Sequence, residues 1–140
     1  MRALDVTTEF GARAERRLRD ELLAWLVTVR ADGTPVPVPV WFLWQGETFL
    51  LYSRPNTAKL RNIARNSRVT LHLDGNGRGG DIVVVTGKAV VSENDDPADE
   101  VPAYVEKYRE LIERNGWTPR SFAADYSIPI CVSFGSLRGH

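Results

Sequence analysis

The chain has 140 residues, 43% of them hydrophobic, and its 18 Lys and Arg residues balance 18 Asp and Glu residues. This length suits one domain with a sizeable core, so we expect a single domain over residues 1–140. A net charge of zero gives the surface as a whole no attraction for nucleic acid or an anionic membrane, which argues against both partners.

The N-terminal segment predicts a helix and no targeting signal. Thr7 or Thr8 is a suitable helix cap. The apolar positions that follow recur at helical spacing: Ala14, Leu18, Leu22 and Trp25. No apolar run approaches the roughly 20 residues that span a bilayer, and the single cysteine, Cys131, fits a reducing compartment. We therefore expect a cytoplasmic protein.

Residues 25–53 predict three strands in a meander, with turns at Asp32–Gly33 and Gln45–Gly46. A short helix is expected over residues 57–66. Two further strands, over residues 69–74 and 81–91, flank the loop GNGRGG. That loop matches the dinucleotide-binding pattern G-x-G-x-x-G, but a strand follows it where the pattern needs a helix, so we assign it to a hairpin.

The C-terminal third predicts two helices and a closing strand. The first helix begins near Pro102, with a stripe of aromatic and aliphatic residues, and ends at Asn115–Gly116. Thr118 and Pro119 start the second helix, and residues 127–134 form the strand. Six strands, mostly in hairpin order, predict a mainly β (α+β) fold: a six-stranded antiparallel barrel with flanking helices.

Three alternating prolines mark one edge of the predicted barrel. Pro35, Pro37 and Pro39 lack N–H groups, and alternate residues of a strand direct these groups to the same side. The strand can therefore pair fully with only one neighbour. Its other edge either protects against aggregation or faces solvent, a ligand or another subunit.

Positive charge is concentrated where the third predicted strand meets its helix. Residues 48–73 contain five basic residues and no acidic one: Arg54, Lys59, Arg61, Arg65 and Arg68. Lys59 falls in the first helical turn, where the helix dipole disfavours a cation unless an anion is bound. Ser53, Thr57, Lys59 and Arg61 could converge on a phosphate. Alternatively, the helix is solvated and the acidic residues 93–100 neutralise it.

Other chemistry has little support in the sequence. His72 and Asp74 share a strand face, but the one other histidine is His140, so we expect no metal site. No arrangement of a nucleophile with a base is present, and we assign no catalytic side chain. If the protein is an enzyme, a cofactor carries the chemistry.

Residues 28–75, with the pattern S-x-x-x-x-A-K-x-R-N at residues 53–62, resemble the pyridoxamine 5'-phosphate oxidase-like split-barrel family. The similarity extends over roughly residues 22–91 and resumes at SIPICVSFGSLRGH. It is greatest to the actinobacterial branch that uses the deazaflavin coenzyme F420. The extended N-terminus and C-terminal substrate-binding signature of true pyridoxamine phosphate oxidases are missing, so vitamin B6 oxidation is not expected.

The resemblance implies an FMN-binding type of split barrel and a homodimer with the cofactor between its subunits. It implies that Thr57, Lys59 and Arg61 bind the phosphate, with Ser53 and Asn62 nearby. It further implies the residues that border the ring system or reach the cofactor near the C-terminus: Val38, Pro39, Val40, Trp41 and Arg138.

Three functions follow as hypotheses. In the first, the protein is an F420-dependent oxidoreductase that transfers a hydride to a small-molecule substrate. In the second, FMN replaces the deazaflavin at the same basic residues. In the third, the protein carries a flavin or deazaflavin without turnover.

Overall fold

The computed structural model describes residues 4–140, which form seven strands, four α-helices and one 3-10 turn. In chain order the elements are α1 (Glu9–Asp20), β1 (Ala24–Val29), β2 (Pro35–Val40), β3 (Leu43–Trp44), β4 (Thr48–Ser53), α2 (Ala58–Arg65), β5 (Arg68–His72), β6 (Val83–Val91), η1 (Ala98–Glu100), α3 (Pro102–Arg114), α4 (Pro119–Asp125) and β7 (Ile128–Gly139).

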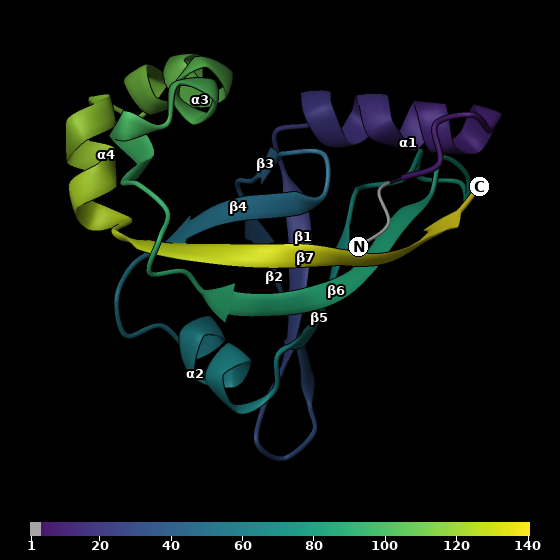
Figure 1. Ribbon diagram of the computed structural model, residues 1–140, viewed down its shortest axis with the longest axis horizontal. Coiled ribbons are helices and arrows are strands. Elements are labelled where there is room, and N and C mark those ends of the chain that lie inside the picture. The colour runs from purple at the N-terminus through teal and green to yellow at the C-terminus, as the bar shows by residue number, and fades with distance from the viewer. Residues whose placement is uncertain (1–3) are drawn as a thin grey trace.

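All seven strands belong to one curled antiparallel sheet, in the order β2-β1-β5-β6-β7-β4-β3. Figure 1 shows β7 crossing the middle of the molecule, with α1 over one end of the sheet and α3 and α4 together at the other. The predicted antiparallel, mainly β class with flanking helices is confirmed. The closing strand is longer than predicted and continues to Gly139.

The two hairpins predicted within residues 25–53 are confirmed as β1–β2 and β3–β4, but the middle strand is divided, which gives seven strands in place of six and no continuous meander. β2 pairs with β1, whereas β3 pairs with β4 at the opposite edge of the sheet. The division falls at Phe42, whose N–H donates to the Tyr108 hydroxyl at 2.8 Å and whose carbonyl accepts from Lys107 Nζ at 2.8 Å. Side chains of α3 thus replace the strand partner that Phe42 lacks, which satisfies a buried backbone.

The proline strand lies at an edge of the sheet, as its missing donors require. Val36, Val38 and Val40 lie opposite Thr28, Leu26 and Ala24 of β1, and no strand lies on the other side of β2 among the described residues. All three prolines are exposed. The prediction of a strand with one pairing edge is confirmed.

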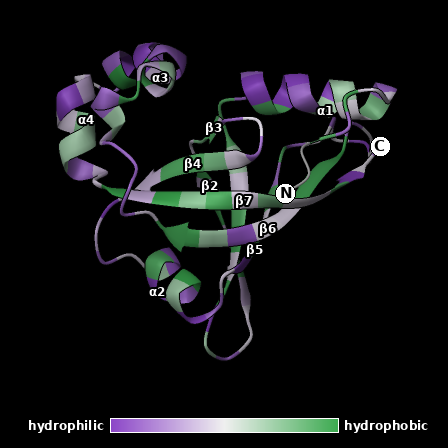
Figure 2. Ribbon diagram, in the orientation of Figure 1, coloured by the Kyte–Doolittle hydropathy of each residue, from purple (hydrophilic) through white to green (hydrophobic). Residues whose placement is uncertain are grey.

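Alternation along β4 separates two apolar clusters. Phe49 and Leu51 point into the barrel core, which is built from all seven strands together with α1 and α2. Leu50 and Tyr52 point to the opposite face and pack against residues of η1, α3 and α4, which we call the helical lobe. β4 is therefore buried on both faces, and Figure 2 shows hydrophobic residues along β4 and β7 between the two clusters.

Capping residues fix the helix ends. The Thr8 hydroxyl accepts from Gly11 N–H at the start of α1, and Thr118 and Ser121 form a reciprocal capping box at the start of α4. The α1 stripe is shorter than predicted, since the helix ends at Asp20 and Trp25 lies in β1. None of the helices formed by residues 4–140 is long and apolar enough to cross a membrane.

Candidate functional site

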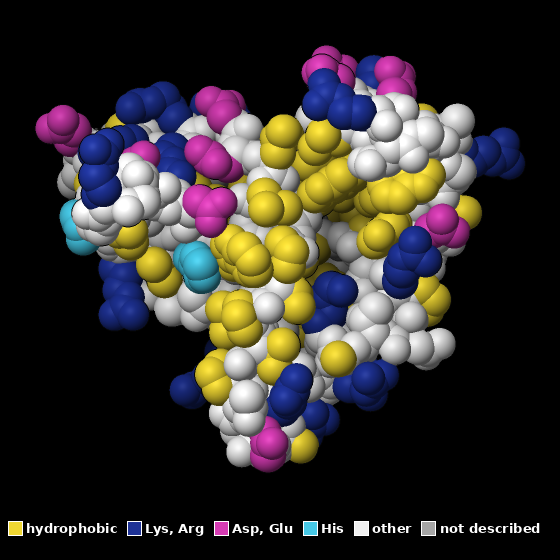
Figure 3. Space-filling model, turned by 180° about the vertical axis from the view of Figure 1, so that it is seen from behind, with side chains coloured by type: hydrophobic (Ala, Val, Ile, Leu, Met, Phe, Trp, Pro, Cys, Tyr) yellow, Lys and Arg dark blue, Asp and Glu magenta, His cyan; other side chains and the backbone are white. Residues whose placement is uncertain are grey.

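A cavity of about 330 Å³ opens where the helical lobe meets β2 and β4. Figure 3 shows hydrophobic side chains gathered at this junction, below the lobe at upper right. The cavity is lined by Leu23, Pro39, Val40, Trp41, Tyr52, Lys59, Tyr104, Trp117, Phe122 and Tyr126. Six of these ten residues are aromatic, and Lys59 is the one charged residue among them.

The aromatic rings of the cavity form a continuous stack. Trp41 lies parallel to Tyr108 at 4.6 Å between ring centroids, and it stacks on Phe122 at 5.2 Å. Phe122 stacks in turn on Tyr126 at 4.7 Å, and Trp117 contacts Trp41 edge-on at 6.3 Å. The stack, which Tyr108 extends behind Trp41, gives the cavity a rigid apolar wall that can border a ring system.

Three tyrosines are buried in the apolar cluster between β4 and the helical lobe, and two of their hydroxyls have protein partners. Tyr52 Oη donates to the Asp96 carbonyl at 2.6 Å, and Tyr108 Oη lies 2.8 Å from the Leu22 carbonyl. Tyr104 Oη has no hydrogen-bond partner among the described residues. Burial raises the pKa of all three phenols, so each remains a protonated donor at neutral pH.

Lys59 enters the cavity from the first turn of α2. Its side chain is half-buried and forms neither a salt bridge nor a hydrogen bond with any described residue. The removal of its ammonium group from water lowers the pKa of Lys59. A half-buried cation without a partner is costly, and a bound anion would remove that cost.

The N-terminus of α2 is also unpaired. The Thr57 hydroxyl stands at the cap position but makes no capping bond, and it lies 3.0 Å from the Ser53 hydroxyl instead. The N–H groups of residues 58–60 have no acceptor within the part of the chain that the structure describes. Ser53 is fully buried, and its hydroxyl donates to the Arg54 carbonyl at 2.7 Å. The helix therefore presents three free N–H groups beside Thr57.

The structure brings only some of the predicted phosphate residues together. Arg61 lies on another side of α2, in a shallow cavity that it shares with Asn62 and Arg30, and its guanidinium donates to the Asn56 carbonyl at 3.0 Å. Asn62 is buried and donates to the Thr28 hydroxyl at 3.0 Å. Arg61 and Lys59 thus line different cavities, and Asn62 ties α2 to β1.

Of the remaining predicted residues, some line the cavity and others lie elsewhere in the fold. Pro39, Val40 and Trp41 line it, whereas Val38 packs against the barrel core. Arg138 is exposed near the end of β7, where it lies opposite Val84 of β6, and it does not line the cavity.

None of the five basic residues between positions 48 and 73 forms a salt bridge with a described residue. The Arg54 guanidinium lies 4.9 Å above the Tyr126 ring, and Arg65 donates to the Asn62 side chain at 3.2 Å. The acidic residues 93–100 therefore do not neutralise the helix by direct pairing, which was the alternative interpretation.

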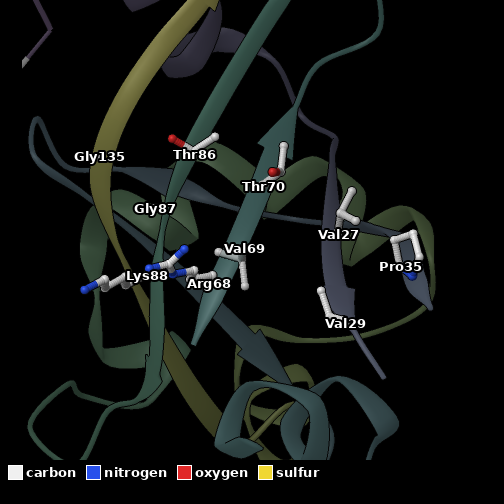
Figure 4. Close-up of a pocket in the computed structure, with 10 residues that line it drawn as sticks. All are labelled: Val27, Val29, Pro35, Arg68, Val69, Thr70, Thr86, Gly87, Lys88 and Gly135. Carbon is white, nitrogen blue, oxygen red and sulfur yellow. The ribbon is translucent and has the colours of Figure 1, made fainter. Parts of the chain in front are cut away.

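A second, larger cavity of about 610 Å³ lies on the outer face of the sheet. Figure 4 shows Val27, Val29 and Pro35 on one side of it, with Arg68 and Lys88 close together on the other. Arg68 and Lys88 are opposite each other in the β5–β6 ladder. None of the residues predicted to bind a cofactor lines this cavity.

Sequence reasoning missed the lobe as part of the site, because Tyr104 was assigned to an ordinary core stripe. The available signal was composition, since five aromatic residues occur between positions 104 and 126. These are Tyr104, Tyr108, Trp117, Phe122 and Tyr126. Among residues 4–140 no group of three or more His, Cys, Asp or Glu is placed to hold a metal ion.

The fold and the sequence are similar to proteins of known structure. One, described as an F420 reductase, is 27% identical and has a TM-score of 0.63, with 89% of this chain and 94% of that chain covered. General Stress Protein 26 from Bacillus anthracis is 18% identical, with a TM-score of 0.67 and coverage of 90% and 89%. The haem storage protein HutZ from Vibrio cholerae is 14% identical, with a TM-score of 0.64 and coverage of 94% and 95%.

No curated protein matches the chain significantly. The family comparison is more decisive, because residues 10–125 match the family described as pyridoxamine 5'-phosphate oxidase. This match covers the sheet from β1 to β6 and both helices of the lobe, and it agrees with the split-barrel topology described above. The chain therefore belongs to the pyridoxamine 5'-phosphate oxidase family.

Proposed function

We propose that this protein is an F420-dependent oxidoreductase that transfers a hydride to a small-molecule substrate. The observation that carries the proposal is Lys59, a half-buried and unpaired cation between a free helix terminus and an aromatic cavity. The F420 reductase of similar structure supports the choice of cofactor. We propose further that the chain forms a single domain and that the protein is cytoplasmic.

The residues present fit a phosphorylated ring cofactor. The free N–H groups of α2, the Thr57 hydroxyl and Lys59 suit an anionic tail, since the helix dipole and a desolvated ammonium group both favour negative charge. Pro39, Val40 and Trp41 offer a flat apolar border for the ring system. Bound there, the cofactor would supply the hydride chemistry. The chain would bind and orient the cofactor and exclude water from it.

Homodimer formation is part of the proposal, with the cofactor held between subunits. The β2 edge has no described strand partner, and the outer face beside it carries Val27, Val29 and exposed prolines. Such a surface favours burial against a second copy of the chain. In such a dimer, the exposed side chains of Arg61 and Arg138 would approach a cofactor that the neighbouring subunit also contacts, whereas the buried Asn62 holds α2 against β1.

The test is a titration of the purified protein with F420 and, separately, with FMN, followed by cofactor fluorescence. We expect F420 to bind more tightly, and Lys59→Ala to weaken its binding by about 1 to 3 kcal/mol, or roughly 5- to 150-fold in Kd. Arg78→Ala, which removes an exposed charge from the GNGRGG loop, is the matched control and should bind normally. Unchanged affinity in the Lys59 variant would refute the assigned phosphate site.

FMN is the alternative cofactor, because the same groups suit either phosphate, and tighter binding of FMN in the titration would select it. A non-catalytic carrier is the second candidate function. One observation favours it: a haem storage protein shares this fold, so the barrel also suits storage. Hydride transfer to enones and quinones by the F420-loaded protein separates enzyme from carrier.

A further inference from the structure

The larger cavity, on the outer face of the sheet, is separate from the aromatic cavity. Its volume is about 610 Å³, and the two cavities share no lining residue. The charged residues that line it are both basic, Arg68 and Lys88, and no acidic residue lines it. A ligand in this cavity would therefore meet positive charge only.

The sheet itself places Arg68 and Lys88 against each other. They lie directly opposite in the antiparallel β5–β6 ladder, and Figure 4 shows their side chains close together. Both residues are exposed, and neither side chain forms a salt bridge or a hydrogen bond with a described residue. Like charges directly opposite each other in a ladder destabilise the sheet. An anion bound between the two side chains would replace that repulsion with two attractions.

Hydroxyl groups lie beside the basic pair. Thr70 and Thr86 are also opposite each other in the β5–β6 ladder, two residues along the strands from Arg68 and Lys88. Because alternate residues of a strand share a face, all four side chains belong to the outer face of the sheet. Both threonines line the cavity, and the Thr70 hydroxyl has no hydrogen-bond partner among the described residues. A bound anion could accept a hydrogen bond there in addition to its contacts with the two cations.

A bulge in β7 shapes the cavity on the side of these groups. Thr86 lies opposite Ser136 and Gly87 lies opposite Phe134, so Gly135 has no partner residue in the β6–β7 ladder. A β-carbon at Gly135 would lie 2.8 Å from the Thr86 carbonyl oxygen, which is too close for any larger residue to fit without a shift. Gly87 and Gly135 both line the cavity and leave it unfilled. Bulges are over-represented next to functional sites.

The other side of the cavity is aliphatic. Figure 4 shows Val27 and Val29 of β1 and Pro35 of β2 on that side, across from the basic pair. No aromatic ring lines this cavity, in contrast to the cavity beside the helical lobe. Aliphatic side chains favour an apolar chain through the water that its burial releases. A ligand that satisfies both sides has an anionic head and an aliphatic body.

We propose that this cavity binds a medium-chain aliphatic carboxylate. The carboxylate lies between Arg68 and Lys88, and the chain lies along Val27 and Val29. Arginine presents paired N–H donors that match the two oxygens of a carboxylate, and the lysine adds a second positive charge. The inference goes beyond the proposed function because it concerns a different cavity, and it holds whichever cofactor the protein binds.

The test uses octanoate as the probe, with 1-octanol as the control that lacks the charge and acetate as the control that lacks the chain. Binding to the full chain is measured by calorimetry at low salt, and methyl NMR signals of Val27 and Val29 locate the ligand. We expect octanoate to shift these signals and to bind more tightly than either control. Added salt should weaken octanoate binding and leave 1-octanol binding unchanged, because salt screens exposed charges.

Lys88→Gln removes one of the two charges and keeps most of the side-chain length. We expect octanoate to bind this variant about 2- to 5-fold more weakly, since the charge is exposed, and the double variant with Arg68→Gln about 5- to 20-fold more weakly. Affinity for 1-octanol should not change. Arg120→Gln, at an exposed position of α4 that does not line the cavity, is the matched control and should bind octanoate normally.

Urea unfolding separates a binding role from a structural one. Because Lys88→Gln relieves the repulsion from Arg68, the ligand-free variant should have a urea midpoint equal to or above that of the natural protein. A lower midpoint would mean that Lys88 serves the sheet and would overturn the inference. So would equal octanoate affinity in the two proteins, or octanoate shifts confined to the aromatic cavity. No octanoate binding by the natural protein, as a second copy seated over the cavity would cause, would overturn it too.

Discussion

The barrel core and the helical lobe bury aromatic residues in opposite ways. In the barrel, Phe42 and Phe49 are fully buried, lie 6.0 Å apart between ring centroids, and have no polar side-chain atom to satisfy. In the cluster between β4 and the lobe, Tyr52, Tyr104 and Tyr108 carry hydroxyls into the interior, and Tyr52 and Tyr104 line the cavity. The first arrangement maximises packing, whereas the second retains space and hydrogen-bonding capacity. From this comparison we expect the barrel to contribute more to stability and the lobe to contribute more to ligand binding.

The largest effect should come from the barrel. Phe49→Ala removes a fully buried ring that contacts Trp44 at 4.6 Å, and we expect a loss of about 3 to 5 kcal/mol in the free energy of unfolding. Trp117→Ala, at a half-buried ring of the cavity, should cost less than about 2 kcal/mol but weaken binding of planar ligands. Urea unfolding of both variants checks this division. Equal losses in the free energy of unfolding would show that the lobe contributes as much to stability as the barrel does.

A smaller effect separates two tyrosines within the lobe. The Tyr108 hydroxyl accepts from the buried Phe42 N–H and lies 3.0 Å from the Phe42 carbonyl, so Tyr108→Phe leaves a buried backbone donor unpaired. We expect a loss of about 1 to 3 kcal/mol in the free energy of unfolding. Tyr104→Phe breaks no such bond and should leave stability unchanged or slightly higher. The same urea measurement applies, and a destabilised Tyr104 variant would indicate a hidden structural partner for its hydroxyl.

Much of the fold could be predicted because local patterns determine it. The proline alternation fixes β2 as an edge strand, and the Thr118 cap starts α4 whatever lies around it. The hairpin assigned to GNGRGG also depends only on nearby residues, and β5 and β6 pair on either side of that loop. Each of these predictions uses donors, φ angles or caps that a few consecutive residues supply.

The candidate site was harder to predict from the sequence because it depends on contacts between distant parts of the chain. The division between β2 and β3 requires Tyr108, which lies 66 residues from Phe42 in sequence. Lys59 and Arg61 are two residues apart, so a helix places them on different sides. Only the fold shows that the aromatic cavity lies beside Lys59 and not beside Arg61. Likewise, the sequence does not distinguish a bonded hydroxyl at Tyr108 from a free one at Tyr104. Positions of single polar atoms follow from packing and not from local pattern.

The smallest effect concerns Lys107, where the lobe meets the barrel. Its ammonium group lies 3.9 Å from the centroid of the Phe42 ring, and burial lowers the pKa of Lys107 to about 8, against the opposing effect of Asp20 and Glu21. Between pH 8 and about 10, the unfolded chain keeps this proton while the folded protein has released it. Stability from this group therefore rises with pH across that window.

Lys107→Met keeps the apolar stem and abolishes this titration. Because both proteins share every other titrating group, including Lys59, Cys131 and the tyrosines, the difference between their unfolding free energies isolates Lys107. We expect that difference to move in favour of the natural protein by on the order of 1 kcal/mol from pH 8 to 10, since solvent screens a partly exposed amine. Parallel stability curves would mean that this lysine keeps an ordinary pKa. The junction between barrel and lobe would then be open to water, and the lobe would be less firmly held against the barrel than the bonds to Phe42 imply.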